Sequence, residues 1–212
     1  NFKSKSGIIP KIIINDDPKK FQIDSLNLLG YDSKHISKWK YSNVKVKKLI
    51  VPSISRKRFG SFDIYYPNSI TWLRDRFKSI TSKLNNSFNQ NIFISRDRAE
   101  GRKILNAYEF SKFLNKYNFT NYCLEEMDFL DQVIMFSNAK NIIAAHGAGL
   151  TNIIFSSNVN IIEIFGAPPK HYTEYYRLAQ NLRHNYSFVF CDYSHDNYIN
   201  NQSSYYYKEH DL

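Results

Sequence analysis

Short apolar runs alternate along the chain with longer segments whose apolar residues recur three and four positions apart. The short runs are typical of buried strands, and the longer segments are typical of amphipathic helices. We expect strands over residues 10–15, 44–53, 91–95, 121–126, 141–145, 160–165 and 187–192. We expect helices over residues 18–31, 69–84, 129–139 and 173–184, and others that begin at residue 106 and near residue 150. From residue 91 onward this alternation predicts an α/β fold built on a doubly wound parallel sheet.

Several of these helices carry sequence signals at their ends. Pro18 suits a first helical turn because it has no backbone N–H to lose, and Gly30 is a stop signal. Asn106 followed by Glu109 resembles a capping box, and Asp128 is a candidate N-cap for the helix after it. Polar stretches predict a loop and a linker over residues 54–67 and 85–90.

The chain has a net charge of +10, which favours anionic partners such as nucleic acid, an acidic membrane surface or a phosphorylated small molecule. The lysines are scattered, so a solvated basic surface without a specific partner is an equally good interpretation. No apolar run approaches the roughly 18 to 20 residues of a membrane-spanning helix. The chain begins with Asn1 rather than Met, so we expect it to be a piece of a longer protein.

Two cysteines and six separated histidines, with no CxxC or HxxxH spacing, argue against a structural metal site. Cys123 lies in a predicted strand, where a small buried apolar side chain is the expected role.

The segment HGAG, residues 146–149, follows the predicted strand over 141–145. Parallel sheets bind ligands beyond the carboxyl ends of their strands, and glycine lets backbone N–H groups approach an anion closely. A helix that begins nearby would direct its unpaired N–H groups at the same place. The residues predicted to bind a diphosphate here are Gly147, Ala148, Gly149, Leu150, Thr151 and Asn152. A tight strand-to-helix turn that binds nothing is the alternative.

Polar and basic side chains follow the strand over 91–95. Ser95 and Arg96 end this strand, so we expect them at the same ligand-binding edge. Arginine suits phosphate because its planar guanidinium group offers two parallel donors. Arg98 and Arg102 can share this role, although either is equally compatible with a solvent-facing charge.

Glu125 and Glu126 end the strand predicted over 121–126. A carboxylate at this edge can accept hydrogen bonds from ribose hydroxyls, and it can equally stabilise the following helix N-terminus. Both glutamates are therefore candidates for ribose or base binding.

The ordered motifs resemble those of glycosyltransferase family 61. The stretch SRDRAEGRKILNAYEF, residues 95–110, is similar to the SRxxAxxRxIxNExE stretch of that family. The segment LEEMDFLDQVIMFSNAKNIIAAHGAGLTNIIF resembles its helix, strand and HGAGLTN block, and NIIEIFG followed by YYRLA resembles its closing strand and helix. The similarity covers roughly residues 10 to 190. Ala107 stands where the family pattern has Glu, whereas Arg96 and Arg102 are matched.

The resemblance implies a GT-B architecture, in which the C-terminal one of two Rossmann-like domains holds a nucleotide-sugar. It implies a partial N-terminal, acceptor-side segment over 1–66, a linking helix and linker over 67–90, the nucleotide-sugar-binding domain over 91–194 and a tail over 195–212. An upstream segment with His and Trp that family members carry is not found, so we expect the N-terminal domain to be incomplete. The resemblance also implies inverting transfer from a UDP-linked sugar to a glycan or protein hydroxyl, without a cofactor or a DxD-bound divalent metal.

Sugar transfer requires a bound donor, stabilisation of the departing diphosphate and a base for the acceptor hydroxyl. We expect His146 and Arg96 to be the catalytic residues, with Arg96, Arg102 and the glycine turn stabilising the diphosphate. His146 can donate to the diphosphate or act as the general base. We favour the first role, because the acceptor in this architecture approaches from the other domain.

The main alternative is a non-catalytic basic module that binds RNA or DNA, in which some of the 16 Tyr and 16 Phe would stack on bases. No RNP-type or helix-turn-helix signature supports it. A nicotinamide or SAM enzyme is disfavoured because no glycine-rich turn follows the first strand. We therefore expect a nucleotide-sugar donor and a glycan or protein acceptor as partners, not nucleic acid. The expected location is the cytoplasm, at a membrane surface in bacterial envelope glycan synthesis, or the Golgi or ER lumen in a eukaryote.

Overall fold

The computed structural model describes residues 7, 9–40, 43, 45–51, 56–59, 62–65, 67–99, 103–166, 173–193 and 205–206. The chain divides into two compact units, Asn1–Ile54 and Ser55–Leu212. Among the described residues, no helix has both the length and the apolar character needed to cross a bilayer.

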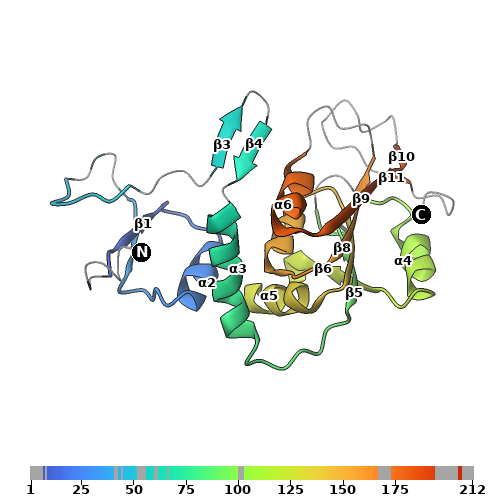
Figure 1. Cartoon of the computed structure of the whole chain (residues 1–212), viewed down its shortest axis with the longest axis horizontal. Coiled ribbons are helices and arrows are strands. Elements are labelled where there is room, and N and C mark those ends of the chain that lie inside the picture. Colours follow the sequence, from blue (N-terminus) through green and yellow to red (C-terminus); the bar gives the residue numbers. More distant parts are fainter. Residues whose placement is uncertain are drawn as a thin grey trace. The chain divides into compact units, whose positions relative to one another are not determined.

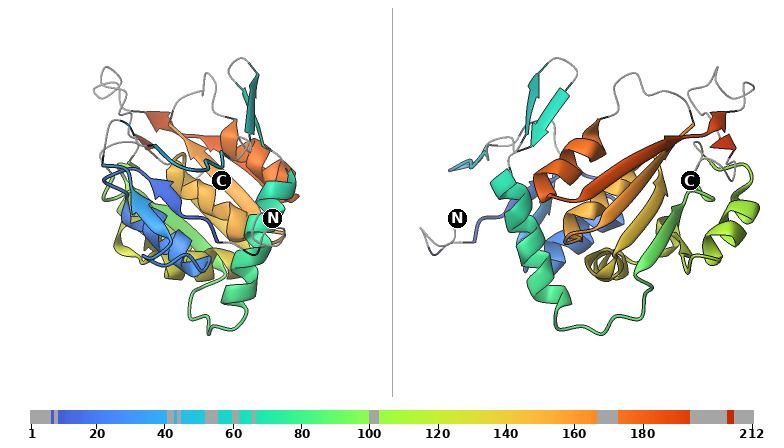
Figure 2. Two further views of the ribbon diagram at one scale, coloured as in Figure 1. Left: turned by 90° about the vertical axis from the view of Figure 1, so that its left-hand side faces the viewer. Right: turned by 45° about the vertical axis from the view of Figure 1, so that its right-hand side comes forward.

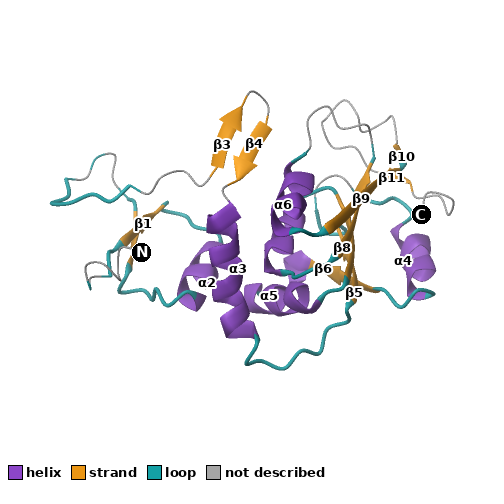
Figure 3. Ribbon diagram, in the orientation of Figure 1, coloured by secondary structure: helices purple, strands orange, loops and turns teal. Residues whose placement is uncertain are grey.

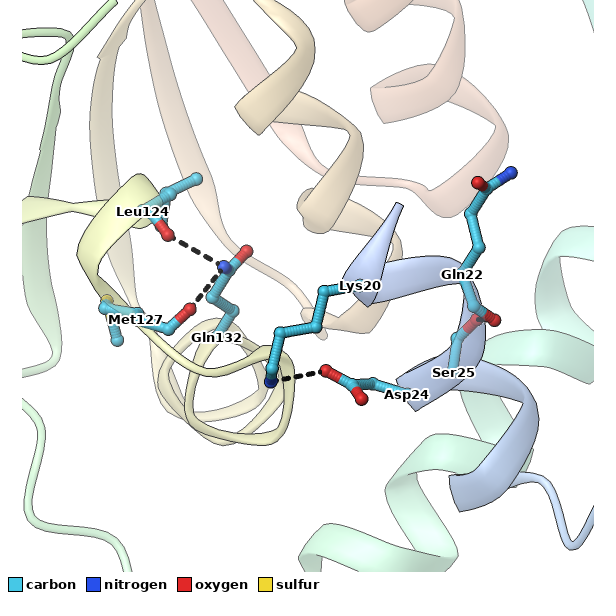
Figure 4. A network of polar contacts seen from close by, with 7 residues as sticks. All are labelled: Lys20, Gln22, Asp24, Ser25, Leu124, Met127 and Gln132. Carbon is cyan, nitrogen blue, oxygen red and sulfur yellow. Dashed lines mark hydrogen bonds and ion pairs between the residues drawn. The ribbon is translucent and has the colours of Figure 1, made fainter. Parts of the chain in front are cut away.

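The first unit contains a β-α-β arrangement. Strand β1 (Ile12–Ile14) and strand β2 (Ile36–Lys38) pair in parallel, and helix α2 (Lys20–Leu28) connects them. Gly30 adopts φ +88° just beyond the helix, a conformation that favours glycine and confirms the predicted stop. Within α2, Lys20 and Asp24 form an exposed ion pair of 2.8 Å (Figure 4).

The prediction of a strand over 44–53 is wrong for residues 45–51, which are the part that the structure describes. Residues 45–51 form no strand and are exposed, and residues 44, 52 and 53 lie outside the described residues. The alternation of Val and Lys suggested a half-buried strand, but a pattern alone provides no neighbouring strand to pair with.

The second unit is built on a five-stranded sheet, seen edge-on in Figure 1 and obliquely in Figure 2. Its strands are β5 (Asn91–Ser95), β6 (Thr120–Cys123), β7 (Asn141–Ala145), β8 (Asn160–Phe165) and β9 (Asn185–Phe190). They lie in the order β6-β5-β7-β8-β9, and every neighbouring pair is parallel. This order is one of the two common doubly wound topologies, so the predicted Rossmann-like sheet is confirmed.

Helices cover both faces of this sheet (Figure 3). The α-helices are α3 (Pro67–Thr81), α4 (Ala107–Asn115), α5 (Phe129–Asn138) and α6 (Glu174–Leu182). Helix α4 lies on the opposite side of the sheet from α5 and α6 (Figure 1). On the α4 side, Phe93, Phe110 and Ile143 belong to one buried apolar cluster. On the other side, Phe77, Phe129 and Phe155 pack edge to face, with ring centroids 4.9 to 5.9 Å apart.

Asparagine side chains connect four strands at the amino edge of the sheet. The first residues of β5, β7, β8 and β9 are all asparagine. Asn141 donates to Asn91 at 2.7 Å, Asn160 donates to Asn141 at 2.7 Å, and Asn185 donates to Asn160 at 2.8 Å. This ladder aligns the strand starts, and therefore also helps to align the carboxyl ends where ligands bind.

Two short antiparallel pairs differ from the predictions. The expected loop over 54–67 contains β3 (Arg56–Phe59) paired with β4 (Phe62–Tyr65). The two residues between these strands are Gly and Ser, a hairpin signal that the charged composition obscured. A second pair, β10 (Asp192–Tyr193) with β11 (Tyr205–Tyr206), was not predicted.

Candidate functional site

The strand order places a topological switch point between β5 and β7. From β5 the chain moves to one side of the sheet through β6, and from β7 it moves to the other side through β8 and β9. Ligands of doubly wound sheets bind outside the carboxyl ends of the strands at such a point. Ser95 and Arg96 follow β5 there, and the HGAG segment follows β7.

The HGAG segment leads directly from a strand into a helix, as predicted. His146 follows β7, and the 3₁₀ helix η2 (Ala148–Phe155) begins two residues later. The structure differs from the prediction only in the helix type. Gly147 has φ 169°, which is extended backbone open to any residue, so conformation does not explain the glycine.

Proximity to Arg96 explains why residue 147 is glycine. A Cβ atom added to Gly147 would lie 3.0 Å from Cζ of Arg96 and would overlap its Nη1 atom. The half-buried guanidinium group therefore occupies the space that a side chain at position 147 would fill. Arg96 and the glycine turn share one sheet edge, as the sequence predicts.

Gly149 makes a different close contact. A Cβ atom on Gly149 would lie 2.7 Å from Cδ1 of Leu124, and its φ is not positive. This glycine therefore permits close packing of η2 against Leu124, the residue that follows β6.

His146 is buried at 6% exposure and held from several sides. Its ring stacks on Phe165 with centroids 5.1 Å apart and an interplanar angle of 23°, and the ring of Tyr175 lies 5.5 Å away. Its backbone N–H donates to the carbonyl of Ile164 at 2.9 Å. Its Nδ1 atom lies 2.5 Å from Oε1 of Glu163.

Glu163 is the residue at this site that sequence reasoning missed. It is 1% exposed on β8, and both of its oxygens are engaged, because the hydroxyl of Tyr186 donates to Oε2 at 2.5 Å. Burial, followed by the bond to Glu163, raises the pKa of Tyr186 well above its ordinary value, so the hydroxyl keeps its proton. The available signal was a glutamate inside an otherwise apolar strand, since a buried carboxylate requires donors.

The other predicted residues of the turn differ in their surroundings. Leu150 is buried, whereas Ala148 and Thr151 are exposed. Asn152 donates to Oε1 of Gln132 at 2.9 Å. Gln132 in turn donates to the backbone carbonyls of Leu124 and Met127 at 2.9 and 3.2 Å (Figure 4). The amide of Asn152 therefore anchors η2 to the segment between β6 and α5.

Ser95 is buried at 3% exposure, and its hydroxyl has no hydrogen-bond partner among the described residues. It sits at the carboxyl end of β5, beside Arg96. Arg102 lies outside the described residues, so its predicted role stays a prediction.

Glu125 and Glu126 do not continue β6 as expected. They belong to a 3₁₀ turn, η1 (Leu124–Glu126), and both are exposed. Glu126 accepts a bond of 2.8 Å from Nε of Arg98, and this bond raises the pKa of Arg98. Glu125 accepts from Sγ of Cys123 at 3.3 Å. Their predicted role in ribose binding stays a prediction.

In the part of the chain that the structure describes, no three His, Cys, Asp or Glu side chains are grouped so that they could hold a metal ion. The polar groups gathered at the switch point are instead a guanidinium, an imidazole and backbone N–H groups, which suit an anionic ligand.

The Rossmann-like sheet defines the class as a doubly wound α/β protein, and its basic, glycine-lined switch point suits an anionic ligand. Comparison with protein families identifies the class further, because the model described as Glycosyltransferase 61 matches residues 6–162, more than half of the chain. The chain belongs to glycosyltransferase family 61, and it is therefore an enzyme that transfers a sugar from a donor to an acceptor. Comparison with curated proteins finds no match.

Proposed function

We propose that this enzyme transfers a sugar, with inversion, from a UDP-linked donor to a hydroxyl group of a glycan or protein. One observation carries the proposal: the guanidinium group of Arg96 lies against Gly147 at the switch point of the sheet. A diphosphate placed there would meet a planar cation and nearby backbone N–H groups.

In this proposal the site acts mainly on the leaving group. Negative charge grows on the diphosphate as the glycosidic bond breaks, and donors fixed beforehand stabilise that charge. Arg96 supplies the positive charge and His146 supplies a ring fixed by Glu163. We assign His146 to the diphosphate rather than to the acceptor hydroxyl. The general base is then expected on another part of the protein.

The β-α-β arrangement of the first unit supports a GT-B architecture for the enzyme. Parallel β1 and β2 joined by α2 are the building block of a Rossmann-like domain. Such a domain would contribute the acceptor side of the reaction.

Calorimetry on the full-length enzyme with a panel of UDP- and GDP-sugars tests the proposal. We expect binding of a UDP-sugar, and NMR of the product should show a glycosidic bond of opposite anomeric configuration. Retention of configuration, or binding of GDP-sugars alone, would contradict the corresponding part of the proposal.

A further inference from the structure

The side-chain amide of Gln132 connects segments that follow two different strands at the carboxyl edge of the sheet. Gln132 lies in the first turn of α5 and is half-buried. Its Nε2 atom donates to the carbonyl of Leu124 at 2.9 Å and to that of Met127 at 3.2 Å (Figure 4). Its Oε1 atom accepts from Nδ2 of Asn152 at 2.9 Å. One side chain of α5 therefore joins the segment after β6 to η2.

The chemistry of the partners fixes the orientation of this amide. Carbonyl oxygens only accept hydrogen bonds, so the NH₂ end of the Gln132 amide has to face Leu124 and Met127. The oxygen end is then directed toward Asn152, and only the NH₂ end of Asn152 can satisfy it. One of the donors of Asn152 is thus used within the protein, on an acceptor whose position two further bonds determine.

The helix that contains Asn152 depends on support of this kind. Helix η2 is a 3₁₀ helix, and the hydrogen bonds of such a helix have poorer geometry than those of an α-helix. Its first residues, Ala148 and Gly149, carry backbone N–H groups that the proposed function directs at the diphosphate. Donors stabilise a transition state best when their positions are fixed beforehand. The positions of these N–H groups therefore depend on the contacts of η2 with its neighbours, among them α5.

We propose that Gln132 is a positioning residue for sugar transfer, which acts through Asn152 to hold η2 and the glycine turn in place for the diphosphate. This inference rests on the proposed function, because it takes the backbone N–H groups of the turn to bind a diphosphate. Gln132 acts without touching the ligand. Asn152, for which the sequence predicts direct diphosphate binding, then serves the site by anchoring η2.

Calorimetry with UDP on the full-length enzyme tests this role. The variants are Gln132→Met, which keeps the length of the side chain without its amide, Asn152→Ala, and the double variant. Gln132→Asn, which withdraws the amide by one methylene group, is the milder substitution that serves if Gln132→Met does not fold. The control is Asn138→Ala at the other end of α5, where the amide donates to the carbonyl of Ile134 at 2.9 Å and to the hydroxyl of Ser137 at 3.2 Å.

Two further measurements separate positioning from a purely structural role. Thermal unfolding reports the stability of each variant independently of its affinity for UDP. The backbone ¹⁵N–¹H NMR signals of Ala148 and Gly149 report whether the turn itself moves. These signals should shift in Gln132→Met and stay unchanged in Asn138→Ala, although both variants lose amide hydrogen bonds.

Each single variant at the Gln132–Asn152 pair should weaken UDP binding about 3- to 10-fold, within the range for losing one neutral hydrogen bond. The double variant should lose no more than the larger single loss, because the two residues act through one bond. Asn138→Ala should leave UDP affinity unchanged.

Unchanged UDP affinity in Gln132→Met would overturn the inference even if its melting temperature falls, because Gln132 would then only stabilise the fold. A loss in Asn152→Ala alone would also overturn it and would return Asn152 to direct diphosphate binding. Losses that add in the double variant would mean that the two residues act independently, which contradicts the inference as well. Each of these results leaves the proposed function standing, whereas failure of the unmodified enzyme to bind UDP would overturn the proposed function itself.

Discussion

The Nδ1 atom of His146 and the Oε1 atom of Glu163 lie 2.5 Å apart in the interior of the second unit. Because Nδ1 is engaged in this way, any contact of the imidazole ring with a ligand has to be made by Nε2. Phe165 stacks on the ring and limits its rotation. The orientation of His146 is thus set before a substrate arrives, which is the condition for electrostatic stabilisation of a transition state.

Glu163→Gln should lower kcat while leaving the protein folded. The amide keeps the shape of the side chain but no longer offers a charged acceptor to Nδ1, and it can donate to Nδ1 instead. We expect a loss of about 10- to 150-fold, the range for a hydrogen bond to a charged group. Steady-state kinetics measure the effect, and ¹⁵N NMR of the His146 ring reports which nitrogen carries the proton. Unchanged kcat and an unchanged ring spectrum would show that Glu163 does not position His146.

Tyr186→Phe should act mainly on stability. The substitution removes the donor to Oε2 of Glu163 and leaves a buried carboxylate oxygen unpaired, which costs about 1 to 3 kcal/mol. Chemical denaturation measures the change in the free energy of unfolding. The control is Tyr108→Phe, at a site that is 77% exposed on α4. If the two variants were equally stable, the hydrogen bond from Tyr186 to Glu163 would not contribute to stability as we expect.

Gly147→Ala and Gly149→Ala form a matched pair of variants in the same turn. The new Cβ at position 147 overlaps the guanidinium group of Arg96, so it should displace that group and weaken donor binding at least tenfold. The new Cβ at position 149 meets only the flexible end of Leu124, which can move, so donor affinity should change little. Calorimetry measures the donor affinity of both variants. A larger loss of donor affinity in Gly149→Ala than in Gly147→Ala would contradict the assignment of the effect to position 147.

Four of the five parallel strands, β5, β7, β8 and β9, could be predicted from the sequence because each contains a short apolar run. The hairpin of β3 and β4 was missed because its strands contain several charged residues. A strand was wrongly predicted over 44–53 because alternating apolar and polar residues do not guarantee a neighbouring strand to pair with. At the site, the sequence placed Arg96 and the glycine turn on one edge, since both follow strands of one parallel sheet.

The bond between His146 and Glu163 could not be predicted in the same way. It depends on β7 and β8 being neighbours and on their register, in which Ala144 pairs with Glu163. Neither the strand order nor the register is readable from the two segments alone. The same holds for Gly149, whose contact with Leu124 depends on how η2 packs.

His184 should make the stability of the fold sensitive to acid. Its side chain is buried and its Nε2 atom bonds to the carbonyl of Ile153 at 3.1 Å. Burial, with a smaller contribution from Arg74, lowers its pKa below the ordinary 6.5. As the pH falls below 6.5, the unfolded chain therefore takes up a proton that the folded protein does not, and the folded state loses stability. Chemical denaturation at pH 7.5 and at pH 5.5 measures the free energy of unfolding. This free energy should fall less between the two pH values in His184→Gln than in the unmodified protein. An equal fall in the two proteins would contradict the role of His184 in acid sensitivity.

Calorimetric titration of the full-length enzyme with its nucleotide-sugar, with and without Arg96, tests the central claim most directly. Arg96→Ala removes a charge-assisted bond to the diphosphate, so we expect affinity to fall about 10- to 150-fold. Arg98→Ala is the control, because Arg98 is exposed and pairs with Glu126 instead, and it should leave affinity within about twofold. If Arg96→Ala binds the donor as tightly as the unmodified enzyme, the diphosphate does not lie between Arg96 and the glycine turn.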